Sequence, residues 1–322
     1  MTKTIQSKLA KIEILLENGE YKNALKQLKA ITNQRTLSLN NQFTCLALEI
    51  RIRIALQELE TALSLNDQLL QLATQLNIPL LTLDALILQA EVLWRASRLD
   101  EAIKAIQKGQ RMLKGKFGVN EKEINRRQGV LLFHNGIIHW FKGDLDAALK
   151  YHQQSLTIRE TLEDREGIAE SLNNIGLVYW SKGDLNRALD YSTQSLRISE
   201  ELNNKYQMGL TLSNMGNIYS RQGMLDKALE CQQQSLTIRE KLGNRHAVLV
   251  SLINLGVILQ MKGDLNQAQE YYQKSLEIAE EIDFKQDIAL AVNNLGTIYE
   301  LKGALDSALE YFQRSVKIYE KL

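Results

Sequence analysis

The sequence has few of the residues that interrupt helices or that form covalent cross-links. Its 322 residues include one proline, Pro79, and two cysteines. A near absence of proline is typical of an almost entirely helical chain, because proline removes a backbone donor and kinks helix interiors. Cys45 and Cys231 are solitary and have no C-x-x-C spacing. We therefore interpret them as small apolar residues of a protein from a reducing compartment.

The sequence also has no marked excess of charge and no long apolar run. The 39 Lys and Arg residues balance 38 Asp and Glu residues, for a net charge of +1. This balance argues against a general role in binding nucleic acid or membrane surfaces. No run of about twenty apolar residues could span a bilayer, and no signal peptide is recognisable at the start. We expect a cytoplasmic protein.

No combination of residues typical of an active site is found. His134, His139, His152 and His246 have no H-E-x-x-H spacing and no cysteine ligand nearby. Nucleophile motifs such as G-x-S-x-G, and the glycine-rich phosphate loops, are missing too. The sequence therefore predicts a non-enzymatic protein with no catalytic residues, metal site or cofactor.

A strict repeat of forty residues organises most of the chain. Four columns of small residues recur at this period: Gly136, Gly176, Gly216, Gly256 and Gly296; Gly143, Gly183, Gly223, Gly263 and Gly303; Ala148, Ala188, Ala228, Ala268 and Ala308; Ser155, Ser195, Ser235, Ser275 and Ser315. A fixed period of this length predicts a solenoid of stacked units, each too small to bury its apolar face alone.

The unit at 167–207 predicts two helices. Apolar residues over 168–179 recur at the i, i+3, i+4, i+7 spacing of one helix face, which we name helix A. Gly183 is placed to end this helix in a left-handed conformation. Asp184 is a plausible N-cap for a second amphipathic helix, helix B, which runs to about Leu202. Each unit should therefore be a tight antiparallel helix pair.

These columns resemble the tetratricopeptide repeat family, which combines a Leu-Gly pair and a tyrosine on helix A with small residues on helix B. The matching residues in two units are Asn174, Ile175, Gly176, Tyr179, Gly183, Ala188 and Ser195, and Leu295, Gly296, Tyr299, Gly303, Ala308 and Ser315. The forty-residue length is similar to kinesin light chains, Rap-type bacterial regulators and arrays preceding CHAT-type protease domains. The resemblance implies an all-α, right-handed superhelical solenoid of about eight helix pairs, with a concave groove that binds extended peptides.

The eight units are not equally regular. Residues 1–113 predict three divergent units, in which Gln57 and Ser97 replace the turn glycine, and residues 121–322 predict five regular ones. Between them, two glycines interrupt the helical pattern at 114–120, which we interpret as a hinge or enlarged loop. Its basic surroundings could hold an acidic partner, although a solvated loop is the favoured interpretation.

Asparagine recurs on the face of helix A that is not used for packing. It stands at Asn174, Asn214, Asn254 and Asn294, with His134 one unit earlier. Asparagine is a mediocre helix former, so its recurrence calls for a reason. Each amide could grip one backbone unit of a bound peptide, forming a ladder; the alternative is that each bonds a neighbouring helix and stiffens the stack. The candidates beside this ladder are Asn173, Asn217, Asn293 and Arg221.

All three tryptophans fall in another column of helix A, at Trp94, Trp140 and Trp180. They could form an aromatic floor for ligand side chains, or they could be buried between successive A helices. The sequence favours neither interpretation over the other. Arg221 is the only obvious cation on this face among the regular units. A clamp of lysines and arginines, like that of tetratricopeptide co-chaperones, is therefore not expected.

We expect an interaction scaffold whose groove binds an extended segment of a partner protein. One alternative is a sensor arm that relays binding to an effector outside this chain, such as a CHAT-type protease. Another is an oligomerisation module. Apolar residues on the last helix B cannot all face the preceding unit, and they suggest self-association through the C-terminal end: Leu305, Leu309, Tyr311, Phe312, Val316, Ile318 and Tyr319.

Overall fold

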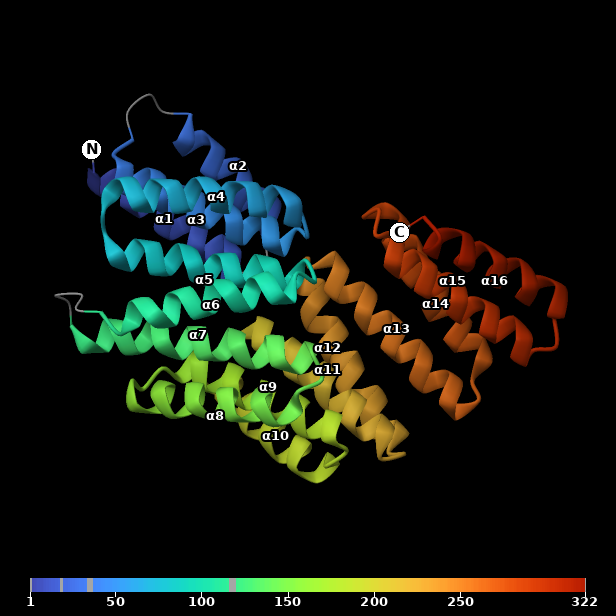
Figure 1. Cartoon of the computed structure of the whole chain (residues 1–322). Helices are drawn as coiled ribbons and strands as arrows, with labels where there is room; N and C mark the ends of the chain where they lie inside the picture. The colour runs from blue at the N-terminus through green and yellow to red at the C-terminus, as the bar shows by residue number, and fades with distance from the viewer. Residues whose placement is uncertain (1, 18–19, 34–36, 116–119, 322) are drawn as a thin grey trace. The chain divides into compact units, whose positions relative to one another are not determined.

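The computed structural model describes residues 2–17, 20–33, 37–115 and 120–321, which form helices joined by short turns and contain no strand (Figure 1). Sixteen helices lie in these ranges, which confirms the predicted all-α class. They are α1 (Thr2–Glu17), α2 (Tyr21–Thr32), α3 (Leu39–Ala55), α4 (Leu59–Leu76), α5 (Pro79–Arg95), α6 (Leu99–Leu113), α7 (Glu121–Phe141), α8 (Leu145–Thr161), α9 (Arg165–Lys182), α10 (Leu185–Glu201), α11 (Lys205–Arg221), α12 (Leu225–Lys241), α13 (Arg245–Lys262), α14 (Leu265–Glu281), α15 (Lys285–Leu301) and α16 (Leu305–Tyr319).

The chain divides into two compact units. The first, residues 1–183, holds α1 to α9, and the second, residues 184–322, holds α10 to α16. Odd-numbered helices correspond to helix A and even-numbered helices to helix B. Within each of the two compact units, a helix A packs against the helix B that follows it, as in α7 and α8 or α13 and α14. Each helix B also packs against the next helix A, as in α8 and α9 or α12 and α13.

The turns between helices A and B use a left-handed residue. Gly183 ends α9 with φ of 83°, and Asp184 caps α10 by accepting a hydrogen bond from the Arg187 backbone N–H at 3.1 Å. Gln57 and Ser97 adopt the same conformation, with φ of 62° and 60°. The turn column read from the sequence is therefore confirmed at both positions where glycine is replaced.

Two of the three other columns, the helix-A glycines and the helix-B serines, hold helix A close to helix B. A Cβ added at Gly136 would lie 2.6 Å from the His152 ring, and one added at Gly256 would lie 2.5 Å from the Tyr272 ring. Glycine thus lets a ring of helix B rest against the backbone of helix A. The serines contribute a bond as well as small size, because the Ser235 hydroxyl donates to the Gly209 carbonyl at 2.7 Å. Ser155 and Ser315 donate in the same way to Gly129 and Ala289.

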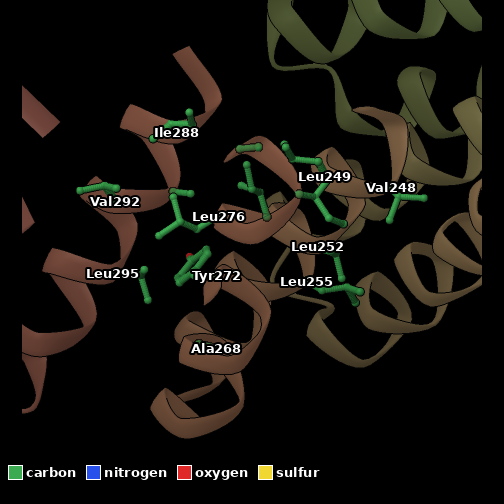
Figure 2. Packing of buried hydrophobic residues seen from close by; sticks show 14 of the residues in the cluster. Val248, Leu249, Leu252, Leu255, Ala268, Tyr272, Leu276, Ile288, Val292 and Leu295 are labelled. Atoms are coloured by element: carbon green, nitrogen blue, oxygen red, sulfur yellow. The ribbon is translucent and has the colours of Figure 1, made fainter. Parts of the chain in front are cut away.

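The core of the second unit is centred on Tyr272, whose side chain is fully buried. Figure 2 shows Tyr272 and Leu276 of α14 between Leu252 and Leu255 of α13 and apolar residues of α15. The Tyr272 hydroxyl donates to Gln260 Oε1 at 3.0 Å, so its polar end is satisfied. The α13–α14 pair therefore buries a large aromatic side chain whose hydroxyl group is hydrogen-bonded.

A recurring polar bond ties successive pairs together. In four of the pairs, a lysine just before the turn reaches the start of the preceding helix B: Lys142 bonds to Asp100, Lys182 to Asp146, Lys262 to Asp226, and Lys302 to Asn266. These bonds lie on the surface, so each adds little stability, but they repeat with the period of the array.

Part of the predicted hinge, residues 116–119, lies outside the described residues. The helices on either side of the predicted hinge, α6 and α7, pack against each other. Arg127 of α7 forms a bidentate ion pair with Asp84 of α5, at 2.7 and 2.9 Å. Whether the chain opens at 114–120 stays a prediction.

Candidate functional site

The four ladder asparagines occupy equivalent positions of α9, α11, α13 and α15. Each is half-buried. Asn174 belongs to the first compact unit, and Asn214, Asn254 and Asn294 belong to the second. The A helices therefore present amide groups that solvent or a ligand can reach.

The hydrogen bonds of these amides differ from one helix to the next. Asn174 Nδ2 donates to the Glu170 carbonyl of its own helix at 3.0 Å. Asn254 Nδ2 donates to Ser213 Oγ of α11 at 3.3 Å. The side chain of Asn294 has no hydrogen-bond partner in the described part of the chain. Bonding to a neighbouring helix thus occurs at Asn254, while Asn294 keeps its full capacity for a ligand.

The residues predicted beside the ladder are exposed to different degrees. Asn293 and Arg221 are exposed, and Asn217 is half-buried with its Oδ1 accepting from Gln232 Nε2 at 2.9 Å. Asn173 is only 1% exposed, so its side chain points into the helix packing. The surface at this place in α9 is instead formed by Asn174.

Exposed apolar side chains lie on the same helices as the amides in the second unit. On α13, Val257 is 40% and Met261 54% exposed; on α15, Leu290 is 38% and Leu301 54% exposed. Exposed aliphatic groups beside amides are typical of surfaces that bind peptides, because the aliphatic groups gain from burial and the amides fix the backbone.

His134, at the ladder position of α7, is buried within the first compact unit. It is 7% exposed, and its Nδ1 accepts a hydrogen bond from Trp94 Nε1 at 3.3 Å. Burial lowers the pKa of His134 to about 4, an effect that the nearby Glu91 carboxylate opposes. The imidazole is therefore neutral at pH 7 and is occupied by the Trp94 indole.

The tryptophan column combines the two interpretations that the sequence left open. The Trp140 indole donates to Ser181 Oγ of α9 at 2.8 Å, so both Trp94 and Trp140 bridge successive A helices. Between them lies Phe141, with ring centroids 5.6 Å from Trp94 and 5.0 Å from Trp140. Phe141 is 51% exposed and supplies an aromatic surface. Trp180, next in the column, is half-buried.

Sequence reasoning missed two buried arginines on the B helices. Arg159 of α8 is 4% exposed, and its Nη1 donates to the Gly167 carbonyl and to Ser171 Oγ. Arg239 of α12 is 8% exposed and donates to the Ala247 carbonyl and to Ser251 Oγ. Burial lowers the pKa of both guanidinium groups. Their spacing of two repeats, on the apolar stripe of helix B, is a signal that could have revealed them.

The described residues contain no cluster of three or more His, Cys, Asp or Glu side chains that could hold a metal ion. None of the described helices is long and apolar enough to cross a membrane. Cys45 and Cys231 are free thiols.

Comparison with known proteins finds a family and a set of similar folds. Residues 128–201, 207–281 and 254–321 match the profile of the tetratricopeptide repeat. A Rap protein complexed with Competence and Sporulation Factor is 15% identical over 100% of this chain and 99% of that one, with a TM-score of 0.66. Kinesin light chain repeats from Podosopora anserina are 16% identical over 63% of this chain and 98% of that one, with a TM-score of 0.51.

A third similar structure is a STAND protein with a tetratricopeptide repeat sensor from Pyrococcus horikoshii. It is 14% identical over 94% of this chain and 53% of that one, with a TM-score of 0.59. A search of curated proteins gives no match. At these identities the structural likeness establishes the fold alone.

Proposed function

Since the chain belongs to the tetratricopeptide repeat family, we propose that it is a non-enzymatic scaffold that binds an extended segment of a partner protein. The observation that carries the proposal is the repeated amide on α11, α13 and α15, flanked by exposed aliphatic side chains. Amides that recur with the repeat suit a ligand that also has a regular backbone, namely a peptide chain.

The spacing of the ladder sets the length of the proposed ligand. Packed helices lie about 8–10 Å apart, and an extended peptide rises about 3.3 Å per residue. Each asparagine would then meet the ligand roughly every third residue. The three rungs of the second unit, Asn214, Asn254 and Asn294, would cover about seven residues.

Two of the similar structures support a role in recognition. The Rap structure holds a bound Competence and Sporulation Factor, and the Pyrococcus horikoshii protein uses its repeats as a sensor. The second of these favours the alternative that this chain is the sensor arm of a signalling protein. The two roles share the binding surface and differ in whether binding is relayed to an effector.

The test begins with a pull-down of partners from the native host. The bound segment would be mapped with overlapping peptides of each partner and titrated by calorimetry against Asn294→Ala. Because one amide pair contributes on the order of 1 kcal/mol, we expect about fivefold weaker binding. Asn266→Ala, an exposed asparagine of α14, serves as the control. Equal affinity of all three proteins would contradict the ladder.

A second role, self-association, is favoured by the surface of α16. Leu305 is 67%, Leu309 57%, Val316 54% and Tyr319 52% exposed. At the positions of Val316 and Tyr319 one repeat earlier, Leu276 and Ala279 are buried. A patch of this kind is typical of an interaction site. We expect light scattering to find a dimer that Leu309→Glu together with Val316→Glu dissociates; a monomeric parent protein would contradict this role.

A further inference from the structure

Arg159 and Arg239 occupy the same position two repeats apart, and each crosses from a helix B to the helix A that follows. Both donate from Nη1 to a backbone carbonyl at the start of that helix, 2.6 Å for Arg159 to Gly167 and 3.1 Å for Arg239 to Ala247. Both also bond a buried serine one turn further along, Ser171 or Ser251. The two guanidinium groups are thus held by the same backbone and hydroxyl acceptors.

The counterion of the two arginines differs. Arg159 Nη2 lies 3.2 Å from Glu170 Oε2, in an ion pair supplied by α9. The residue at the position of Glu170 in α13 is Val250, and Arg239 makes no ion pair with any described residue. Burial lowers the pKa of Arg239 to about 10, and only Tyr206 opposes this shift. Arg239 is therefore still a cation at neutral pH, without the carboxylate that its counterpart has.

A buried charge without a counterion is unfavourable, because the protein replaces only part of its hydration. Glu170 reaches Arg159 from the face of helix A that also carries Asn174, and its side chain is 47% exposed. A guanidinium at this depth is thus within reach of a carboxylate that comes from the solvent side. Nothing in the packing of α12 and α13 supplies such a group to Arg239.

The ladder positions of the second unit favour an anion, and Asp287 near the start of α15 is paired with His246 of α13 at 3.1 Å. The residues at the ladder face of its three A helices include no carboxylate: Leu210, Asn214, Asn217 and Arg221 on α11; Val250, Asn254, Val257 and Met261 on α13; Leu290, Asn293, Asn294, Thr297 and Leu301 on α15. The one charged member, Arg221, is positive. An anionic ligand group would meet attraction and no repulsion from these positions.

We propose that Arg239 recognises a carboxylate of the bound segment, which takes the place beside Val250 that Glu170 takes beside Arg159. Asn254 lies one helical turn beyond Val250, so the same segment can meet Arg239 through its carboxylate and Asn254 through its backbone. This assignment rests on the proposed peptide binding and adds its specificity. The carboxylate comes from an aspartate or glutamate side chain or from the end of a chain.

Three variants isolate the charge. Val250→Glu supplies the internal counterion, and we expect it to raise the melting temperature and to exclude the ligand carboxylate. Val250→Gln has the same bulk without the charge and should weaken carboxylate recognition less than Val250→Glu does. Arg239→Gln removes the cation, and circular dichroism would check that this variant folds. If Arg239→Gln does not fold, Val250→Glu still tests the proposal.

The probe is a random nonapeptide library displayed on phage and selected on the parent protein. We expect the enriched peptides to share an Asp or Glu at one position. The most enriched peptide, synthesised with an amidated end, should bind at least about thirtyfold more tightly than its Asn or Gln counterpart. Val250→Glu and Arg239→Gln should abolish this discrimination. Peptides without an acidic residue, made with a free or an amidated end, show whether a chain terminus serves instead.

The outcomes separate the two proposals. Enriched peptides without acidic residues, bound equally well with free and amidated ends, would overturn the role of Arg239 and leave peptide binding intact. Discrimination that survives in Val250→Glu would also overturn it. No enrichment of any peptide would contradict peptide binding itself, and the role of Arg239 with it.

Discussion

The pairs α7–α8 and α13–α14 are built on the same columns, yet their interiors differ in chemistry. In the first, His152 lies against Gly136; in the second, Tyr272 lies against Gly256. His152 is 1% exposed, and its Nδ1 has no hydrogen-bond partner among the described residues. Tyr272 is fully buried and bonded through its hydroxyl. The glycine fixes how closely the helices approach, and the opposite residue is free to be polar or apolar.

Because of this difference, the stability of the two helix pairs depends on different properties. The α7–α8 interior also contains Arg159 and, close by, His134, so part of its stability depends on protonation. The α13–α14 interior depends on packing around one ring. A repeat architecture therefore specifies geometry at its small residues, while charge is decided locally at the residues that face them. Four experiments test this contrast.

The largest effect should follow Tyr272→Ala. Removing a fully buried aromatic side chain leaves a cavity, and such changes cost about 3–5 kcal/mol. Phe312 occupies the same column of α16 against Gly296 but is only half-buried, so Phe312→Ala should cost clearly less. Urea unfolding monitored by circular dichroism would compare them. Equal losses would show that burial in this column does not decide stability.

The next effect is a loss of stability in acid that originates in the first unit. Burial lowers the pKa of His152 to about 3 and that of His134 to about 4, against about 6.5 in the unfolded chain. As pH falls below about 6.5, the unfolded chain binds protons that the folded chain does not, so stability decreases until the folded pKa values are reached. At pH 5 each histidine should cost roughly 2 kcal/mol.

The matched variant for this test is His152→Gln, because Gln232 fills the same column in α12. It should remove about half of the difference in unfolding free energy between pH 7.5 and pH 5. His246→Gln is the control, since that histidine is only half-buried. An unchanged pH dependence in His152→Gln would show that the buried imidazole is not the cause.

The sequence predicted the skeleton of this fold better than its interior. Helix pairs, the left-handed turns at Gln57 and Ser97, and the small-residue columns all follow from local rules of helix ending and close approach. The interior of α7–α8 did not follow, because His152 stands in a column shared with Gln232, Tyr272 and Phe312 that has no constant chemistry. Asn173 was likewise assigned to the surface because a helical wheel places it beside Asn174, without showing which neighbours cover it.

The third experiment gives Arg159 the neighbour that Arg239 has. Glu170→Val gives α9 the residue that α13 has and removes the carboxylate that pairs with Arg159, which leaves Asp164 as the remaining acidic group near it. Breaking a fully buried pair costs about 3–5 kcal/mol, but Glu170 is half-exposed, so we expect about 1 kcal/mol. Glu170→Gln retains the shape and should lose nearly as much. Melting temperatures that match the parent protein would mean that solvent or Asp164 already compensates the charge of Arg159.

The smallest effect concerns the ladder without any ligand. Asn254 donates to Ser213 across two A helices, whereas the Asn294 side chain has no partner in the described part of the chain. Alanine is the better helix former by a few tenths of a kcal/mol, while a net hydrogen bond contributes about 0.5–1.5 kcal/mol. Asn254→Ala should therefore lower the unfolding free energy slightly, and Asn294→Ala should leave it unchanged or raise it. If both variants are destabilised equally, the asparagines stiffen the stack at every rung; if neither is, all of them are free to hold a peptide.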